Sequence, residues 1–338
     1  MKTATDSERA EYRNVWVIAE ERLGEIKAVT FELLGAARRL AGTRHSQVWC
    51  VLIGGQVTRL APACFERGAD TVLVVDHPDL ARFVDEAHGA VLSRLVRKYK
   101  PEIVLCGATT RGRALIPRVA VEVCAGLTAD CTGLEIDPQS GILLQTRPAF
   151  GGNIMATIKT VNHRPQMATV RPRVMPEPEA VPGRHGTLIT ETLATGEKNW
   201  RAQVLEIITD TKETVKLADA NFIVTGGRAI GGPDGFKLLR EFAELVSGAV
   251  GASRAAVDAG WIDYSHQVGQ TGTTVHPQVY LACGVSGQIQ HLVGMQTSDL
   301  IVAINKDPDA PMMKLADFAI VGDVFEIIPA MMREIRRV

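Results

Sequence analysis

The first half of the chain alternates short β-branched apolar runs with longer stretches in which apolar residues recur at helical spacing. The run at 14–20, NVWVIAE, predicts a strand, and the apolar residues of 26–42 follow helical spacing up to Gly42. The same pattern predicts strands at 47–55 and 71–77, a helix over 80–99, and a strand leading into a helix over 102–126. Strands that alternate with helices in this way indicate a parallel, doubly wound sheet.

The middle of the chain is less regular. Shorter runs split by Gly and Pro occupy about 127–174, and we expect strands there that extend or cap the first sheet. The stretch 171–186 carries four prolines, which hold the backbone extended and remove hydrogen-bond donors, so it is predicted to be exposed connecting chain. One more strand is expected at 202–209, AQVLEIIT.

A second alternating series fills the rest of the chain. It predicts strands within 221–228, 249–254, 278–287, 299–307 and 318–323, and helices over 236–248, 288–295 and 324–337. A length of 338 residues also exceeds what one hydrophobic core usually supports. We therefore predict an α/β protein of two doubly wound domains with largely parallel sheets, an N-terminal domain of 1–208 and a Rossmann-like C-terminal domain of 209–338, with the boundary near Thr209.

Composition narrows the classes of function. The hydrophobic fraction of 46% and the charged fraction of 22% are those of a soluble globular protein. With a net charge of −1 and scattered basic residues, no nucleic-acid partner is expected. The six cysteines form no CxxC and no Cys/His cluster, so they predict buried thiols in a reducing compartment and no metal site. A polar N-terminus and the lack of a long apolar run predict a cytoplasmic protein without membrane insertion.

Five predicted strands of the C-terminal domain end in polar or glycyl residues. Ligands of open α/β sheets bind outside the carboxyl ends of the strands, and Ser286-Gly287 before a predicted helix suits a pyrophosphate. One Gly-rich strand end alone is equally well a turn, but five in one domain favour a ligand site. This half contains neither GxGxxG nor a GxxxxGK[ST] phosphate loop, so the site is of another type. The strand-end residues are Gly226, Gly227, Arg228, Ser253, Arg254, Ser286, Gly287, Asn305 and Asp323.

Six segments of the C-terminal half carry a more specific signal. In order, they are GGRAIGG (226–232), ASRAAVDAGW (252–261), HQVGQTG (266–272), GVSGQIQHLVGM (284–295), INKDPDAP (304–311) and FAIVGD (318–323). Through them the chain closely resembles the alpha subunit of electron transfer flavoproteins, and the N-terminal half resembles it more loosely over 101–120, 125–137 and 147–158. The resemblance implies a heterodimer with a smaller beta subunit, FAD held mainly by the C-terminal domain, and electrons received from an acyl-CoA dehydrogenase or another redox partner.

The resemblance also implies which residues contact FAD. Arg228 and Ser253 match the pyrophosphate region, Thr271 matches the residue bonded to flavin N5, and His291 matches the histidine beside flavin O2. Asn305, Asp323 and Val324 match the adenosine end. No catalytic residue and no metal ligand are expected. The predicted FAD-binding set is Arg228, Ser253, Arg254, Gln267, Val268, Gly269, Gln270, Thr271, Ser286, Gly287, Gln288, Ile289, Gln290, His291, Asn305, Asp323 and Val324.

Arg254 resembles the arginine that lies against the isoalloxazine ring. A fixed cation a few ångströms away stabilises an anionic semiquinone by about 1–3 kcal/mol at intermediate dielectric, so Arg254 is expected to set the redox poise. If the resemblance to the family is set aside, Arg228 and Arg254 are interpreted as ordinary surface arginines, and His291 as a packed residue of an apolar helix. Cys106, Thr109 to Arg113 and the segment RPAFGGN (147–153) are interpreted as scaffold, the last as a hairpin or subunit-interface element.

Three other functions remain open at this point. A self-sufficient flavin dehydrogenase would need a general base near N5, but the flavin loop contains no Asp or Glu. An adenine-nucleotide adaptor would hold no flavin. Within the family, the beta subunit holds either AMP or a second FAD, and the second FAD would permit electron bifurcation from NADH.

Overall fold

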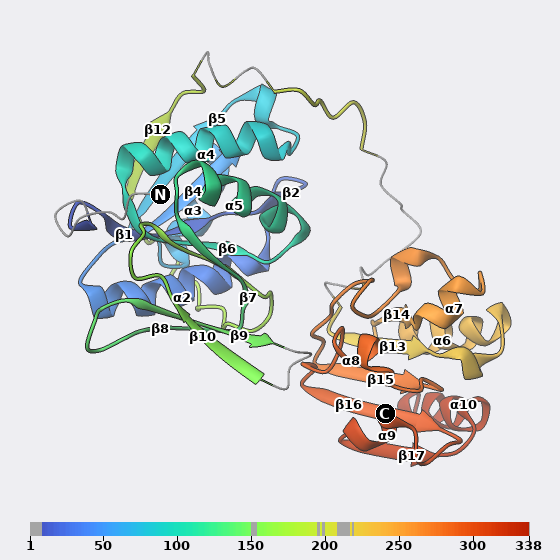
Figure 1. Ribbon diagram of the computed structural model, residues 1–338. Coiled ribbons are helices and arrows are strands. Elements are labelled where there is room, and N and C mark those ends of the chain that lie inside the picture. The colour runs from blue at the N-terminus through green and yellow to red at the C-terminus, as the bar shows by residue number, and fades with distance from the viewer. Residues whose placement is uncertain are drawn as a thin grey trace. The chain divides into compact units, whose positions relative to one another are not determined.

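The computed structural model describes residues 9–149, 154–194, 197, 200–207, 217 and 220–337. Contacts divide the chain into two compact units, Met1–Ile207 and Ile208–Val338, shown in Figure 1. The boundary predicted near Thr209 lies outside the described residues.

The N-terminal domain is built on a seven-stranded parallel sheet with the strand order β12-β5-β4-β1-β6-β11-β7. Helices α2, α4 and α5 follow β1, β5 and β6 closely enough to form the predicted crossovers, with the short helix α3 before β5. The bounds are β1 Arg13–Ile18, α2 Ala28–Arg44, β4 Val48–Gly54, α3 Ala61–Glu66, β5 Thr71–Asp76, α4 Asp85–Tyr99, β6 Pro101–Gly107, α5 Thr110–Glu122, β7 Gly126–Cys131, β11 Gln166–Val170 and β12 Thr187–Glu191. A small hairpin pairs β2 (Glu21–Arg22) with β3 (Glu25–Ile26).

Strand β1 shows why this sheet is buried on both faces. Val15 and Val17 pack in one hydrophobic cluster with α2, whereas Trp16 and Ile18 pack in the other with α4 and α5. Side chains of a strand alternate between its two faces, so a continuous apolar run is what a strand covered on both sides needs. The doubly wound, α/β prediction for this domain is confirmed.

Part of the region 127–174 extends the first sheet, as expected, and part forms a smaller sheet whose Leu134 and Leu143 pack in one of the two hydrophobic clusters of the first sheet. Strands β7 and β11 join the seven-stranded sheet, with β11 placed between β6 and β7. Strands β8 (Gly133–Ile136), β9 (Leu143–Ala149) and β10 (Ile154–Lys159) form a separate antiparallel sheet. The segment RPAFGGN (147–153), interpreted as a hairpin or subunit-interface element, begins in β9, and its residues 150–153, between the paired strands β9 and β10, lie outside the described residues.

The proline-rich stretch 171–186 contains no helix or strand, as predicted, but it leads into a strand that the pattern did not reveal. Strand β12 pairs in parallel with β5 at the edge of the first sheet. The strand predicted at 202–209 is wrong over its described residues, 202–207. The carbonyl groups of Val204 and Leu205 accept hydrogen bonds from Arg82, and the Leu205 side chain is exposed. This apolar run therefore neither pairs with a strand nor packs Leu205 in a hydrophobic core.

The C-terminal domain is a five-stranded parallel sheet with the order β14-β13-β15-β16-β17. Its predicted strands and long helices are confirmed, whereas the helix expected over 288–295 is a single turn. The bounds are β13 Phe222–Gly226, α6 Pro233–Leu245, β14 Ala249–Ala252, α7 Arg254–Asp258, β15 Val279–Cys283, α8 Ile289–Leu292, β16 Leu300–Asn305, α9 Pro311–Leu315, β17 Phe318–Val321 and α10 Val324–Ile335.

The two faces of this sheet are covered differently. Val224, Leu281 and Ile304 pack with the long helices α6 and α10, while Ile223 and Tyr280 pack on the opposite face with Val268, Met295 and the residues of α9. The second face is therefore covered by short elements and loops. Those loops leave the carboxyl ends of the parallel strands, where open α/β sheets bind ligands.

Candidate functional site

A cavity of about 830 Å³ lies at the carboxyl ends of β13, β14 and β15. Its volume is within the range of sites for cofactors and drug-sized ligands, roughly 300–1,000 Å³. Twelve of the predicted FAD-binding residues line it. They are Arg228, Ser253, Arg254, Gln267, Val268, Gly269, Gln270, Thr271, Ser286, Gln288, Gln290 and His291.

Two glycines allow the strand-end loops to meet around this cavity. A Cβ on Gly227 would lie 2.0 Å from the Gly284 carbonyl oxygen, so the loops after β13 and β15 touch backbone to backbone. Gly287 has φ +83°, and a Cβ there would lie 2.4 Å from the Met312 nitrogen. Only glycine fits both positions without moving the backbone.

The loop 266–272 is held in place by a hydrogen bond within it and by hydrogen bonds to Tyr264 and Gln290. Gln267 is buried, and its Nε2 donates to Thr271 Oγ1 at 3.0 Å. The Gln270 N–H donates to the Gln290 carbonyl at 2.7 Å, and the Tyr264 hydroxyl donates to the Thr271 carbonyl. The predicted flavin loop is thus an ordered wall of the cavity.

Two buried polar atoms on cavity-lining residues lack a hydrogen bond of normal geometry within the described residues of the chain. They are Ser253 Oγ and His291 Nδ1. Burial lowers the pKa of His291 to about 4, and the Val268 carbonyl only partly opposes that shift. His291 is therefore neutral at pH 7. Buried polar atoms are normally paired, so these two are suited to contact a ligand.

Charge in the cavity comes from three exposed side chains, those of Arg228, Arg254 and Asp258. Arg254 Nε lies 3.2 Å from Asp258 Oδ2, one helical turn later on α7. Arg228 forms no ion pair with any described residue. Because Asp258 offsets one of the two arginines, the lining groups together favour an anion.

The other five predicted residues, Gly287, Ile289, Asn305, Asp323 and Val324, do not line this cavity. Asn305 Nδ2 donates to the carbonyl of the lining residue Val285 at 3.1 Å, so it lies next to the cavity. Asp323 accepts from the Phe325 N–H at the start of α10, and its ion pair with Lys306 lowers its pKa. The structure also adds lining residues that the sequence did not suggest, Ala255, Asp258, Gly284 and Val285.

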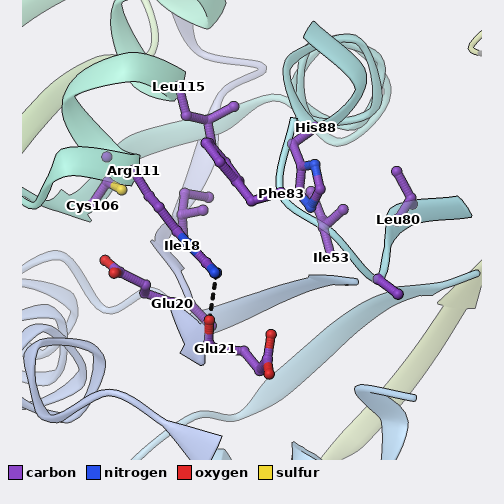
Figure 2. A pocket seen from close by; sticks show the side chains of 13 residues that line it. Ile18, Glu20, Glu21, Ile53, Leu80, Phe83, His88, Cys106, Arg111 and Leu115 are labelled. Atoms are coloured by element: carbon purple, nitrogen blue, oxygen red, sulfur yellow. Dashed lines mark hydrogen bonds between the residues drawn. The ribbon is translucent and has the colours of Figure 1, made fainter. Parts of the chain in front are cut away.

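A second, much smaller cavity lies in the N-terminal domain at the ends of β1, β4 and β6. Figure 2 shows Arg111 reaching toward Glu21, whose carbonyl accepts from Arg111 Nη1 at 2.5 Å. Burial lowers the pKa of His88 to about 4 and raises that of the Cys106 thiol to about 12. With about 40 Å³, this cavity has room for a few water molecules and not for a dinucleotide. These contacts agree with a scaffold role for Cys106 and Arg111.

The described residues contain no cluster of three or more His, Cys, Asp or Glu side chains placed to hold a metal ion. None of their helices is both long and apolar enough to cross a bilayer.

Comparison with known proteins gives two family matches. The model described as the electron transfer flavoprotein domain matches residues 15–195, and that described as the electron transfer flavoprotein FAD-binding domain matches 216–296. The first match covers more than half of the chain, and the second covers all the residues that line the large cavity.

Curated relatives are similar over nearly their whole length. The electron transfer flavoprotein subunit alpha of Thermoanaerobacterium thermosaccharolyticum is 51% identical over 97% of this chain and 99% of its own. Protein FixB of Clostridium saccharobutylicum is 46% identical, over 97% and 98%. The acryloyl-CoA reductase electron transfer subunit beta of Anaerotignum propionicum is 41% identical, over 96% of both chains.

Proposed function

The chain belongs to the family of electron transfer flavoprotein alpha subunits, and from this premise we propose that it pairs with a beta subunit and carries electrons between redox proteins. Its cofactor is FAD, for which it carries the family's FAD-binding domain. We further propose that it works in the cytoplasm, as its cysteines, all free thiols, suggest. The donor is an acyl-CoA dehydrogenase or another dehydrogenase.

The observation that best supports this proposal is the large C-terminal cavity. It has the volume for a cofactor, and its wall combines backbone loops held close by Gly227 with two orphaned polar atoms, Ser253 Oγ and His291 Nδ1. Those features fit FAD, which presents a pyrophosphate, hydroxyl groups and ring acceptor atoms. Bound FAD supplies the ability to take up and release one or two electrons.

Different lining side chains are suited to different parts of FAD. Arg228, with no described carboxylate beside it, is suited to the pyrophosphate, together with Ser253. Arg254 is suited to the ring, where a partly offset cation favours added negative charge without holding it too tightly. Gln267 and Thr271 keep the loop 266–272 in one shape, which orients the ring.

A self-sufficient dehydrogenase is less well supported. Such an enzyme needs a free base beside the reacting carbon of its substrate. Among the described lining residues the one carboxylate is that of Asp258, and it is paired with Arg254. The neutral His291 is the other candidate base, and its low pKa makes it a weak one.

The proposal is tested by counting FAD. The chain is co-expressed with its beta subunit, the complex is purified, and the released FAD is measured per heterodimer. A purified complex without FAD would overturn the flavin assignment, and failure of the two chains to form a complex would overturn the proposed partner. One FAD supports a simple carrier, and two FAD favour a bifurcating protein that oxidises NADH.

A further inference from the structure

A line of buried polar side chains leads from the core of the C-terminal domain to its cavity. Tyr280, on β15, is 0% exposed and belongs to the cluster formed by Ile223, Val268 and Met295. Its hydroxyl oxygen lies 2.9 Å from Nε2 of His291, which is 7% exposed and lines the cavity. The Thr225 hydroxyl also lies near the phenol, in a contact that falls short of normal hydrogen-bond geometry.

The surroundings of His291 decide which ring nitrogen carries its proton. The Val268 carbonyl is near enough to the His291 ring to oppose the effect of burial on its pKa, and Nδ1 forms no hydrogen bond of normal geometry within the described residues. Because Nε2 faces Tyr280, we infer that Nδ1 is the nitrogen on the side of this carbonyl. A carbonyl only accepts, so it favours a proton on Nδ1. Nε2 is then bare and accepts the O–H of Tyr280. The opposite tautomer would turn the Nδ1 lone pair toward the carbonyl oxygen and would leave the phenol to donate to Thr225.

We propose that Tyr280 is a positioning residue for His291, whose Nε2 it binds so that a neutral Nδ1–H donor is fixed at the cavity wall beside Val268. No described residue fully satisfies that donor, which leaves it for an acceptor atom of the ligand. With FAD as the ligand the inference rests on the proposed function. A ring carbonyl oxygen is the kind of acceptor that suits it, because negative charge grows there on reduction.

Burial strengthens the hydrogen bond between Tyr280 and His291. Burial raises the pKa of the Tyr280 phenol far above its usual value, so the hydroxyl keeps its proton and remains a donor. A hydrogen bond in such a dry environment is stronger than one in water, and a buried group left without its partner is costly. Loss of the Tyr280 hydroxyl should therefore change the tautomer of His291 and, through it, weaken ligand binding in the cavity.

The tautomer can be read directly by nitrogen NMR of the full-length chain in complex with its beta subunit, labelled with ¹⁵N-histidine. The His291 signal is identified by its loss in His291→Asn. We expect a neutral ring protonated at Nδ1 in the wild type, and a loss of that preference in Tyr280→Phe. The control is Tyr99→Phe, which removes a hydroxyl bonded to Glu191 at 2.6 Å in the other domain. A wild-type ring protonated at Nε2 would overturn the proposal even if the Tyr280 variant failed to fold, as would an unchanged tautomer in Tyr280→Phe.

A double-mutant cycle separates positioning from simple packing. Tyr280→Phe should weaken FAD binding by about three- to tenfold, the usual range for one hydrogen bond. The same change should have less than about a twofold effect in a His291→Asn background, where the amide nitrogen stands near the place of Nδ1. Equal losses in both backgrounds would make Tyr280 a structural residue only. A wild-type complex without FAD would refute the proposed function instead, and the tautomer result would still stand.

Discussion

Replacing Gly227 with alanine should push apart the loops after β13 and β15, which form the wall of the C-terminal cavity. The three atoms nearest to the new Cβ, at 2.0, 2.6 and 2.7 Å, all belong to the backbone of Gly284 and Val285. No side chain can rotate away to relieve such a contact. Overpacking of this kind costs about 1–3 kcal/mol. If the strain falls on the FAD-bound form, the dissociation constant of FAD rises about 5- to 150-fold.

The measurement is a fluorescence titration of the deflavinated complex with FAD, together with urea unfolding. A matched control is Gly42→Ala in helix α2, where a Cβ meets nothing within 4 Å. That change should leave FAD binding unaltered and stabilise the N-terminal domain by about 0.5–1 kcal/mol. The reasoning fails if Gly227→Ala binds FAD within about twofold of the wild type and unfolds at the same urea concentration.

Three further outcomes are expected. Arg254→Ala should lower the first one-electron potential of FAD by roughly 40 mV, which corresponds to about 1 kcal/mol for an exposed cation. Asp258→Asn should raise that potential, because it removes the charge that offsets Arg254. Redox titrations in which both variants shift the potential in the same direction would contradict this. Burial lowers the pKa of His291 and of His88 from 6.5 to about 4, so the unfolded state binds more protons and both domains lose stability as pH falls from 6.5 toward 4. The free energy of unfolding, measured at several pH values, should depend less on pH for the C-terminal domain in His291→Gln and for the N-terminal domain in His88→Gln. Glu191→Gln should destabilise the N-terminal domain by about 1–3 kcal/mol in urea, since that carboxylate accepts from three side chains and fixes strand β12; no change would refute its structural role.

The sequence predicted the alternating elements well because each buried strand carries apolar residues on both faces. In β1, Val15 and Trp16 meet different helical layers, and both must be apolar. Helix α2 likewise ends within two residues of the predicted Gly42. Local pattern suffices wherever a segment's burial is decided by its immediate neighbours in sequence.

Sequence pattern does not reveal what is decided by pairing with distant residues. Strand β11 extends the first sheet as expected, but nothing in this buried five-residue run indicates that its place is between β6 and β7. The run 202–207 has similar composition, yet Leu205 is 82% exposed. The difference between them is a partner strand far away in the chain, and periodicity carries no information about it.

Strand ends alone indicated four of the twelve predicted residues that line the cavity, and the other eight, including His291, came from the family resemblance. Neither source indicated two residues that matter for the site. Asp258 stands at the end of the short helix α7, one turn beyond the strand end at Ser253. Tyr280 lies inside β15, eleven residues from its partner His291, so neither spacing nor composition joins them. Residues that act through another side chain become visible only once the fold has brought the two together.

Burial divides the polar groups of this cavity into two kinds. Arg254 is largely exposed, so it keeps its charge, but water and salt screen it, and its influence on FAD should shrink as the Debye length falls from about 10 Å at 0.1 M salt to about 3 Å at 1 M. His291 and Tyr280 are buried and neutral, so they add no charge, but salt does not screen the hydrogen bond between them. Salt should therefore weaken the effect of Arg254→Ala on the potential and leave the effect of Tyr280→Phe on FAD affinity in place. The contribution of the hydrogen bond to FAD binding thus persists when the ionic strength of the surroundings changes, whereas the contribution of the arginine does not.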